Sequence, residues 1–213
     1  MLAGGGRWSL LAIVALALVA CSNSSSSLDA SASPATQPST GAAPWPRPEN
    51  TLQLVRKASL VPATHEYFTY HVHAHLDVFV NGKPVTVPAG LGINITDPGV
   101  QSGTVNGAPA YGGIARCVKP CISPLHTHDT TGVIHIEAKT QTTFTLGLLF
   151  TEWGVELDST CVGGYCDPGE SAVFVNGDRA GGDPASVQLA DHQEIAIVIG
   201  TPPATIPSVF PQA

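Results

Sequence analysis

The sequence predicts a mostly β, α+β domain in which a mixed or antiparallel sheet carries one main amphipathic helix. Long stretches alternate apolar and polar residues, and an Asn-Gly pair follows two of them, which is typical of strands joined in hairpins. The helix is indicated by Leu146, Leu149, Phe150 and Trp153, which recur at helical spacing. Together these patterns predict a sheet packed against a single helix.

The N-terminus is expected to lie outside the globular domain. Residues 1–20 have the pattern of a secretory signal peptide, with Arg7 ahead of an apolar run too short to span a bilayer. Residues 21–50 are rich in Ser, Thr, Ala and Pro, which predicts an irregular tether. A single globular domain is expected over residues 51–213, a length that suffices for one core.

The first elements of the domain lead to a strand with histidines on one face. Residues 51–62 fit either a short strand or one to two turns of helix. Residues 67–80 alternate strictly and predict a strand, and Asn81-Gly82 predicts that residues 83–87 return beside it as a hairpin. The polar face of this strand carries His71, His73, His75 and Asp77.

The middle of the chain alternates loops with a second histidine-bearing strand. Residues 88–113 are rich in Gly, Pro, Asn and Asp, so we expect loops there, with only residues 91–95 strand-like. Residues 133–137 alternate again, which places His135 and Glu137 on one face of a strand. Two strands are therefore expected to present imidazoles.

The last third of the domain is expected to complete the sheet. The helix should end at Gly154, because glycine is favoured just after a helix. Residues 173–177 repeat the letters of residues 78–82, Val-Phe-Val-Asn-Gly, and predict another hairpin. Residues 195–200 are almost entirely apolar and predict a strand buried on both faces.

The cysteines indicate an oxidising compartment. Setting Cys21 aside leaves an even number, Cys117, Cys121, Cys161 and Cys166, for which disulfides are expected in an exported protein. The short spacings favour Cys117 with Cys121 and Cys161 with Cys166, although four cysteines allow three connectivities. A four-cysteine zinc site is the alternative.

Charge argues against one class of partner. The chain carries 9 Lys plus Arg against 16 Asp plus Glu. This acidic balance offers no basic patch to displace the counterions of nucleic acid, so nucleic acid is not an expected partner.

The histidines are the candidate metal ligands. An H-x-H pair on a strand sets two imidazoles about 7 Å apart at the backbone, close enough for both to bind one ion with bonds of about 2.0–2.1 Å. We therefore expect a pair from each stretch to meet around one divalent ion, with affinity falling below about pH 6.5 as the imidazoles take up protons. The candidate ligands are His71, His73, His75, His126, His128, His135 and Glu137.

Imidazole ligands suit zinc or copper(II), whereas copper(I) is disfavoured because Met1 is the sole methionine. The function predicted from these residues is divalent-metal binding. One alternative is a metal-dependent enzyme with three histidines, an open position for water, and Glu137 or Asp129 as general base. Another is a pH-sensing interaction domain, because imidazole titrates near neutrality. Asp129 could instead serve only as a turn residue.

Leu18-Val19-Ala20-Cys21 follows the apolar run, precedes a run of serines, and resembles a bacterial lipobox. The resemblance implies a lipoprotein that carries lipid such as palmitate on Cys21. Such a protein would be anchored at the extracytoplasmic face of the cell membrane, with the membrane and the metal ion as its partners and no protein partner identified. A stray cysteine near an ordinary signal-peptide cleavage site is the alternative.

Two further resemblances concern the domain itself. From His71 to the C-terminus, the H-x-H-x-H strand and the His-Thr-His-Asp segment at residues 126–129 resemble a group of exported bacterial proteins without an assigned function. Residues 133–200, with Thr-Leu-Gly at 145–147 and Phe-Val-Asn-Gly at 174–177, resemble a β-grasp unit. The first resemblance implies that the histidine array is the distinctive feature, and the second implies one helix packed across a mixed sheet.

Overall fold

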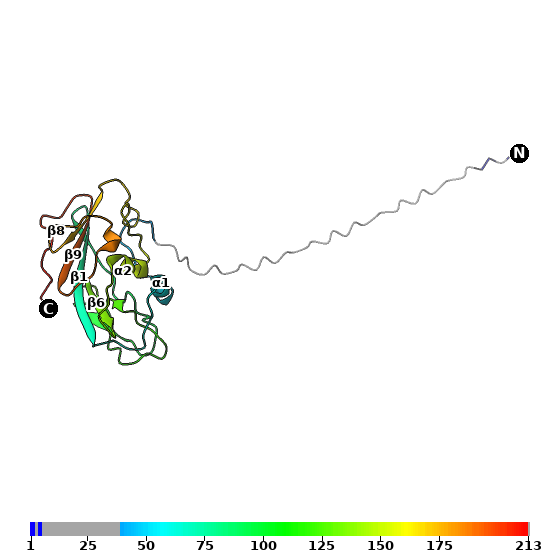
Figure 1. The fold of residues 1–213 in the computed structure, drawn as a ribbon. Helices are drawn as coiled ribbons and strands as arrows, with labels where there is room; N and C mark the ends of the chain where they lie inside the picture. The colour runs from blue at the N-terminus through cyan, green and yellow to red at the C-terminus, as the bar shows by residue number, and fades with distance from the viewer. Residues whose placement is uncertain (3, 6–38, 213) are drawn as a thin grey trace. The chain divides into compact units, whose positions relative to one another are not determined.

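The computed structural model describes residues 1, 2, 4, 5 and 39–212, and the fold lies within residues 39–212 (Figure 1). Cys21, and with it the predicted lipid attachment, lies outside the described residues, as does most of the predicted signal peptide and tether. Within the described ranges, no helix has the length and apolar character needed to cross a membrane.

The structure is mostly β, as the sequence predicts, and it contains the one predicted helix, α2 (Leu146–Trp153), and a second short helix, α1 (Thr51–Lys57). The elements in chain order are α1 (Thr51–Lys57), β1 (Tyr70–Val80), β2 (Lys83–Val85), β3 (Gln101–Val105), β4 (Ala108–Gly112), β5 (Leu125–His126), β6 (Val133–Ala138), α2 (Leu146–Trp153), β7 (Ser171–Val175), β8 (Asp178–Arg179), the 3₁₀ turn η1 (Pro184–Ser186) and β9 (Gln193–Ile199).

The main sheet is mixed, with strand order β5-β6-β1-β9-β7-β8 and β2 paired with the end of β1. β1 and β9 run parallel at its centre, and every other pair in the sheet is antiparallel. One helix, α2, connects β6 to β7 and packs across this sheet. The β-grasp resemblance implied this layout for residues 133–200, and the structure adds β1 as a central strand.

Both helices lie on the same side of the sheet (Figure 1). The stripe residues of α2, Leu146, Leu149, Phe150 and Trp153, are buried against the apolar face of the sheet. Burial of each such side chain contributes about 1.5–3 kcal/mol to stability. Gly154 ends α2 in a left-handed conformation with φ of 72°, as predicted. The opposite face of β1 is left to the histidines.

One prediction for residues 88–113 is wrong, because this stretch contains a hairpin rather than only loops. β3 and β4 pair around Asn106-Gly107, whose φ angles of 51° and 80° suit a tight hairpin turn. β3 is exposed along its length and no residue of β4 is fully buried, so these strands lack the apolar alternation that marks a strand buried on one face. The strand-like residues 91–95 form no strand and contribute only one isolated bridge, from Ile93 to Ile122.

Packed structure begins upstream of residue 51. Trp45 is 2% exposed and meets Trp153 edge to face, with ring centroids 5.7 Å apart. Ser39 pairs with Val155 in a short bridge. The ambiguous stretch of residues 51–62 begins with a helix, α1. An aromatic residue in a Pro-rich segment is thus enough to anchor it on the core.

The structure contains two disulfides, Cys117 with Cys121 and Cys161 with Cys166. These are the pairs that the short spacings favour. Their formation leaves no thiolate for the alternative four-cysteine zinc site.

Candidate metal centre

Strand register brings the histidines together. β6 lies between β1 and β5, so His135 faces His73 on one neighbour and His126 on the other. In the next row of the ladder His71 faces Glu137. Residues directly opposite each other in an antiparallel pair are close enough for their side chains to meet. Three strands therefore contribute polar groups to one place on the sheet.

Three imidazole nitrogens converge on a point between β1 and β6. His71 Nε2 lies 3.0 Å from His73 Nε2 and 3.3 Å from His135 Nδ1, and the last two atoms are 3.2 Å apart. Donors bound to one ion through bonds of about 2.0–2.1 Å lie roughly 3.0–3.4 Å from one another. The triangle has these dimensions, so the three nitrogens are placed to share an ion.

Glu137 adds a carboxylate oxygen beside this triangle. Its Oε2 accepts a hydrogen bond of 3.0 Å from the backbone N–H of Tyr67, which fixes the side chain. The other oxygen, Oε1, lies 3.3 Å from His71 Nε2 and 3.6 Å from both His126 Nε2 and His135 Nδ1. Glu137 is buried, so this oxygen points at imidazoles rather than at water.

The backbone orients the two histidines of the second stretch. His126 Nδ1 is 3.0 Å from the carbonyl of Ser123, and His128 Nδ1 is 2.5 Å from the carbonyl of Tyr111 on β4. A carbonyl only accepts hydrogen bonds, so Nδ1 of each ring carries the proton and Nε2 keeps its lone pair. Fixing the tautomer in this way is how proteins prepare metal-binding histidines.

Two buried atoms at the centre have no hydrogen-bond partner among the described residues, His126 Nε2 and Glu137 Oε1. Leaving a buried polar atom without a partner costs about 1–3 kcal/mol, so each case needs a cause. Both atoms are metal donors, and both belong to a group whose ligand atoms lie within 4.8 Å of one another: His126, His128, His135 and Glu137. His71, His73 and His135 form a second such group.

Burial keeps several of these imidazoles neutral. It lowers the pKa of His73 to about 4, and the neighbouring His135 and His71 add to the effect. Burial likewise lowers the pKa of His126, followed by the charge of His128, and it lowers the pKa of His135. A neutral imidazole binds a metal without first losing a proton. Proton competition at these three residues thus starts below the pH of about 6.5 expected for ordinary histidines.

His75 is the one predicted ligand that neither group contains. Its Nδ1 lies 2.8 Å from Glu194 Oε2 and its Nε2 lies 2.7 Å from the carbonyl of Thr131, so acceptors face both nitrogens. Burial opposes protonation, but the hydrogen bond and charge of Glu194 outweigh it and raise the pKa of His75. Acceptors at both nitrogens favour the doubly protonated ring, which has no lone pair for a metal. Asp77 adds a second carboxylate beside the ring, with its Oδ2 3.8 Å from His75 Nδ1.

The turn before β6 explains the roles of Asp129 and Gly132. Asp129 Oδ1 accepts hydrogen bonds from the backbone N–H and the hydroxyl of Thr131, which is the turn role considered for it from the sequence. Gly132 has a φ of +88°, and a Cβ there would lie 2.5 Å from the carbonyl of Leu76. Only glycine fits this close approach, which sets β6 in register with β1.

Sequence reasoning missed Glu66, whose Oε1 lies 3.4 Å from His128 Nε2. Burial, together with the charge of Glu137, raises the pKa of Glu66. The residue stands just before the first histidine strand, outside any spacing that marks a ligand. The sequence analysis also missed the role of the β3–β4 hairpin. The carbonyl of Tyr111 orients His128, and the Tyr111 N–H donates to the His128 carbonyl at 2.8 Å. The Asn106-Gly107 pair, which is typical of a hairpin turn, could have indicated this hairpin.

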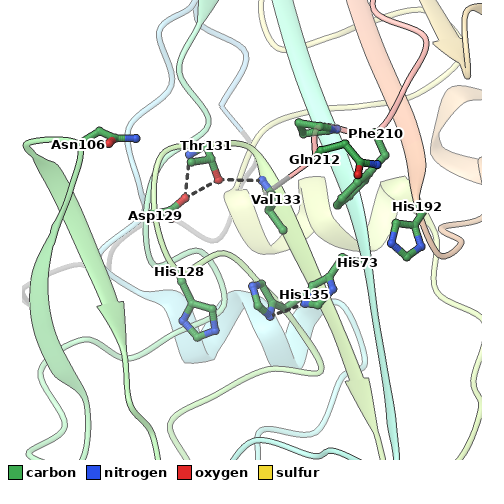
Figure 2. Close-up of a pocket in the computed structure, with 11 residues that line it drawn as sticks. His73, Asn106, His128, Asp129, Thr131, Val133, His135, His192, Phe210 and Gln212 are labelled. Atoms are coloured by element: carbon green, nitrogen blue, oxygen red, sulfur yellow. Dashed lines mark hydrogen bonds between the residues drawn. The ribbon is translucent and has the colours of Figure 1, made fainter.

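A pocket of about 660 Å³ opens beside the centre. Figure 2 shows His73, His128 and His135 along one part of its lining. His192 and Phe210 lie across from them. The imidazoles are therefore reachable from outside, on the face of the sheet away from the helices.

Comparison with models of protein families, with curated proteins and with solved structures finds no match for this chain. The centre must therefore be interpreted from its own geometry. That geometry shows histidine clusters that could hold a metal ion.

Proposed function

We propose that this protein binds a divalent metal ion at the extracytoplasmic face of a membrane, through the histidine cluster between β1, β5 and β6. The observation that carries the proposal is the triangle of His71, His73 and His135 nitrogens, 3.0–3.3 Å on each side, with Glu137 Oε1 beside it. Hydrogen bonding alone cannot satisfy three mutually adjacent ring nitrogens, because each offers only one proton or one lone pair.

The donors favour zinc or copper(II). Imidazole and carboxylate groups suit these borderline ions, whereas copper(I) prefers thiolate and thioether sulfur. The four cysteines of the domain are joined in disulfides, and the chain has a single methionine, Met1. No soft ligand therefore accompanies the histidines in the described residues.

The lipobox-like stretch ending at Cys21 supports a lipid anchor, and the disulfides support an oxidising compartment. Replacement of Cys21 by serine should release the protein from the membrane into the soluble exported fraction, as measured by cell fractionation. Mature wild-type protein without an acyl mass would contradict the anchor.

The metal proposal is tested by the double change His135→Ala with Glu137→Gln. His135 belongs to both ligand groups and Glu137 Oε1 lies next to three imidazoles, so this variant should lose stoichiometric zinc and copper(II) binding. The control is His65→Ala, which removes an exposed histidine outside both groups. Titration calorimetry and metal analysis of protein without a histidine tag provide the readout. Equal binding by the variant and the control would overturn the proposal.

Metal-dependent hydrolysis is a second candidate, favoured by the pocket that His73, His128 and His135 line. A metal facing a pocket can hold a water whose pKa it lowers toward 7. Asp129 also lines this pocket, and its Oδ1 accepts hydrogen bonds from Thr131. Ester hydrolysis that requires zinc and disappears in His135→Ala with Glu137→Gln would support this candidate. Hydrolysis unaffected by a chelator would contradict it.

A further inference from the structure

We infer that the centre holds two divalent ions bridged by Glu137, an inference that rests on the proposed metal binding and specifies its stoichiometry. The number of donors exceeds what one ion takes. Zinc is usually bound by four groups, and the side chains that meet here are His71, His73, His126, His128, His135, Glu137 and Glu66. Seven donors are too many for one tetrahedral ion and suffice for two that share a ligand.

The donors form two groups that share His135, and we divide them into two sets by the contacts that each ring makes. The first set is the triangle of His71 Nε2, His73 Nε2 and His135 Nδ1. The second set consists of His126 and His128, whose Nδ1 atoms are occupied by backbone carbonyls, with Glu66 Oε1 3.4 Å from His128 Nε2. Each set offers three donors and lacks a fourth.

Glu137 Oε1 supplies the fourth donor to both sets. It lies 3.3 Å from His71 Nε2 in the first set and 3.6 Å from His126 Nε2 in the second. It is also buried and has no hydrogen-bond partner among the described residues. A carboxylate shared in this way holds two ions about 3.5–4 Å apart, the separation usual in two-metal sites.

The charge balance agrees with two ions. Glu66 and Glu137 have side chains 16% and 3% exposed, and in the described part of the chain their ion pairs are with histidines alone. Burying carboxylates without fixed cations is costly. Two divalent ions would neutralise both carboxylates and leave net positive charge facing the pocket.

The inference is tested by counting ions on the full-length protein, produced in an exporting host without a histidine tag. Saturation with zinc chloride or copper(II) sulfate should give two ions per chain. In the copper form, ions about 4 Å apart couple magnetically, so the electron paramagnetic resonance signal should account for less copper than metal analysis finds. The control His65→Ala should behave as the parent.

Two variants each remove donors from one set and leave the other set intact. His128→Ala with Glu66→Gln should bind one copper(II) ion whose resonance signal accounts for all the copper present. His73→Ala should also bind one ion, at the other set. Circular dichroism checks folding. If the double variant does not fold, the isosteric Glu66→Gln alone takes its place and should weaken binding of the second ion at least tenfold.

Each result has a distinct meaning. One ion per parent chain with a full copper signal overturns the two-ion inference and leaves the proposed function standing. No bound ion overturns both. Two coupled ions in His128→Ala with Glu66→Gln, or an unweakened second ion in Glu66→Gln alone, overturns the assignment of the second set.

Discussion

His73 and His75 stand two residues apart on the same face of β1, yet their surroundings give them opposite chemistry. His73 Nε2 meets two other imidazole nitrogens, and burial lowers its pKa to about 4. His75 meets a carboxylate and a carbonyl, which raise its pKa. The first favours a neutral ring with a lone pair to share, and the second favours a protonated ring with acceptors at both nitrogens.

The difference arises on the neighbouring strands. On β6 His73 faces His135, whereas His75 faces Val133 and has no imidazole opposite it. On β9 the residue paired with His75 is Glu194. An H-x-H-x-H strand therefore does not define three ligands. The strands beside it decide which imidazoles bind metal and which serve the fold.

Matched alanine variants test the difference between His73 and His75 most directly. His73→Ala should weaken the zinc ion of the His71, His73 and His135 set about 100- to 1,000-fold, because structural zinc binds with about 10–16 kcal/mol, or about 2.5–4 kcal/mol for each of four donors. His75→Ala should change the same affinity less than about threefold. Competition titration with a chromophoric chelator measures both. A similar loss in the two variants would show that the strand acts as one ligand row.

The stability of the metal-free domain should respond in the opposite sense. His75→Ala leaves Glu194 buried without its partner, and loss of one member of a buried pair costs about 3–5 kcal/mol. Glu194 can take up a proton, since burial raises its pKa, so we expect a loss of about 2–3 kcal/mol. His73→Ala should cost less than about 1 kcal/mol, as it relieves crowding among imidazoles. Urea unfolding measures the free energy of unfolding of both variants. A larger loss in His73→Ala than in His75→Ala would contradict the assignment of His75 to the fold and His73 to the metal.

Acid should sharpen the contrast further. The pKa values of His73, His126 and His135 are lowered in the fold, so their contribution to the stability of the metal-free protein declines as pH falls below about 6.5. The raised pKa values of His75 and Glu194 act in the other direction, because protonation of each favours the folded state. The two groups of residues therefore oppose each other on acidification.

The double change His75→Ala with Glu194→Gln tests this opposition. The variant should lose stability more steeply than the parent between pH 7.5 and pH 5, since the groups that offset the decline are gone. The free energy of unfolding in urea, measured without metal at both pH values, provides the comparison. Equal slopes would show that His75 and Glu194 do not titrate as their contacts imply.

Much of the fold could be predicted because local signals agree with the global structure. Strict alternation marked β1 and β6, the stripe from Leu146 to Trp153 marked α2, and Asn176-Gly177 marked the turn between β7 and β8. The β3–β4 hairpin was not predicted because none of its strand residues is fully buried and they carry no apolar pattern. The burial of Trp45 in the core was not predicted because the surrounding prolines indicate an irregular segment.

The site could be predicted only as far as residue type and face allow. Alternation indicates that His71, His73 and His75 share a face, and the structure agrees. Register is a long-range property, so the sequence could not show that Val133 rather than a histidine faces His75. Glu66 was missed for the same reason, since its contact with His128 joins segments about sixty residues apart and no local pattern records it.

The smallest expected effect concerns Phe210, which lies on the His75 side of the division. Its ring centroid is 6.4 Å from that of His75 and 5.0 Å from that of His192, and it lines the pocket in front of His73 and His135. Phe210→Ala should open this pocket and speed release of the bound ion, by less than about tenfold or 1.4 kcal/mol, because no donor is removed. Stopped-flow chelation measures the rate, and metal analysis should find an unchanged stoichiometry. A loss of affinity as large as that of His73→Ala would mean that the C-terminal segment orders the imidazoles, and that the two histidines of β1 are not independent after all.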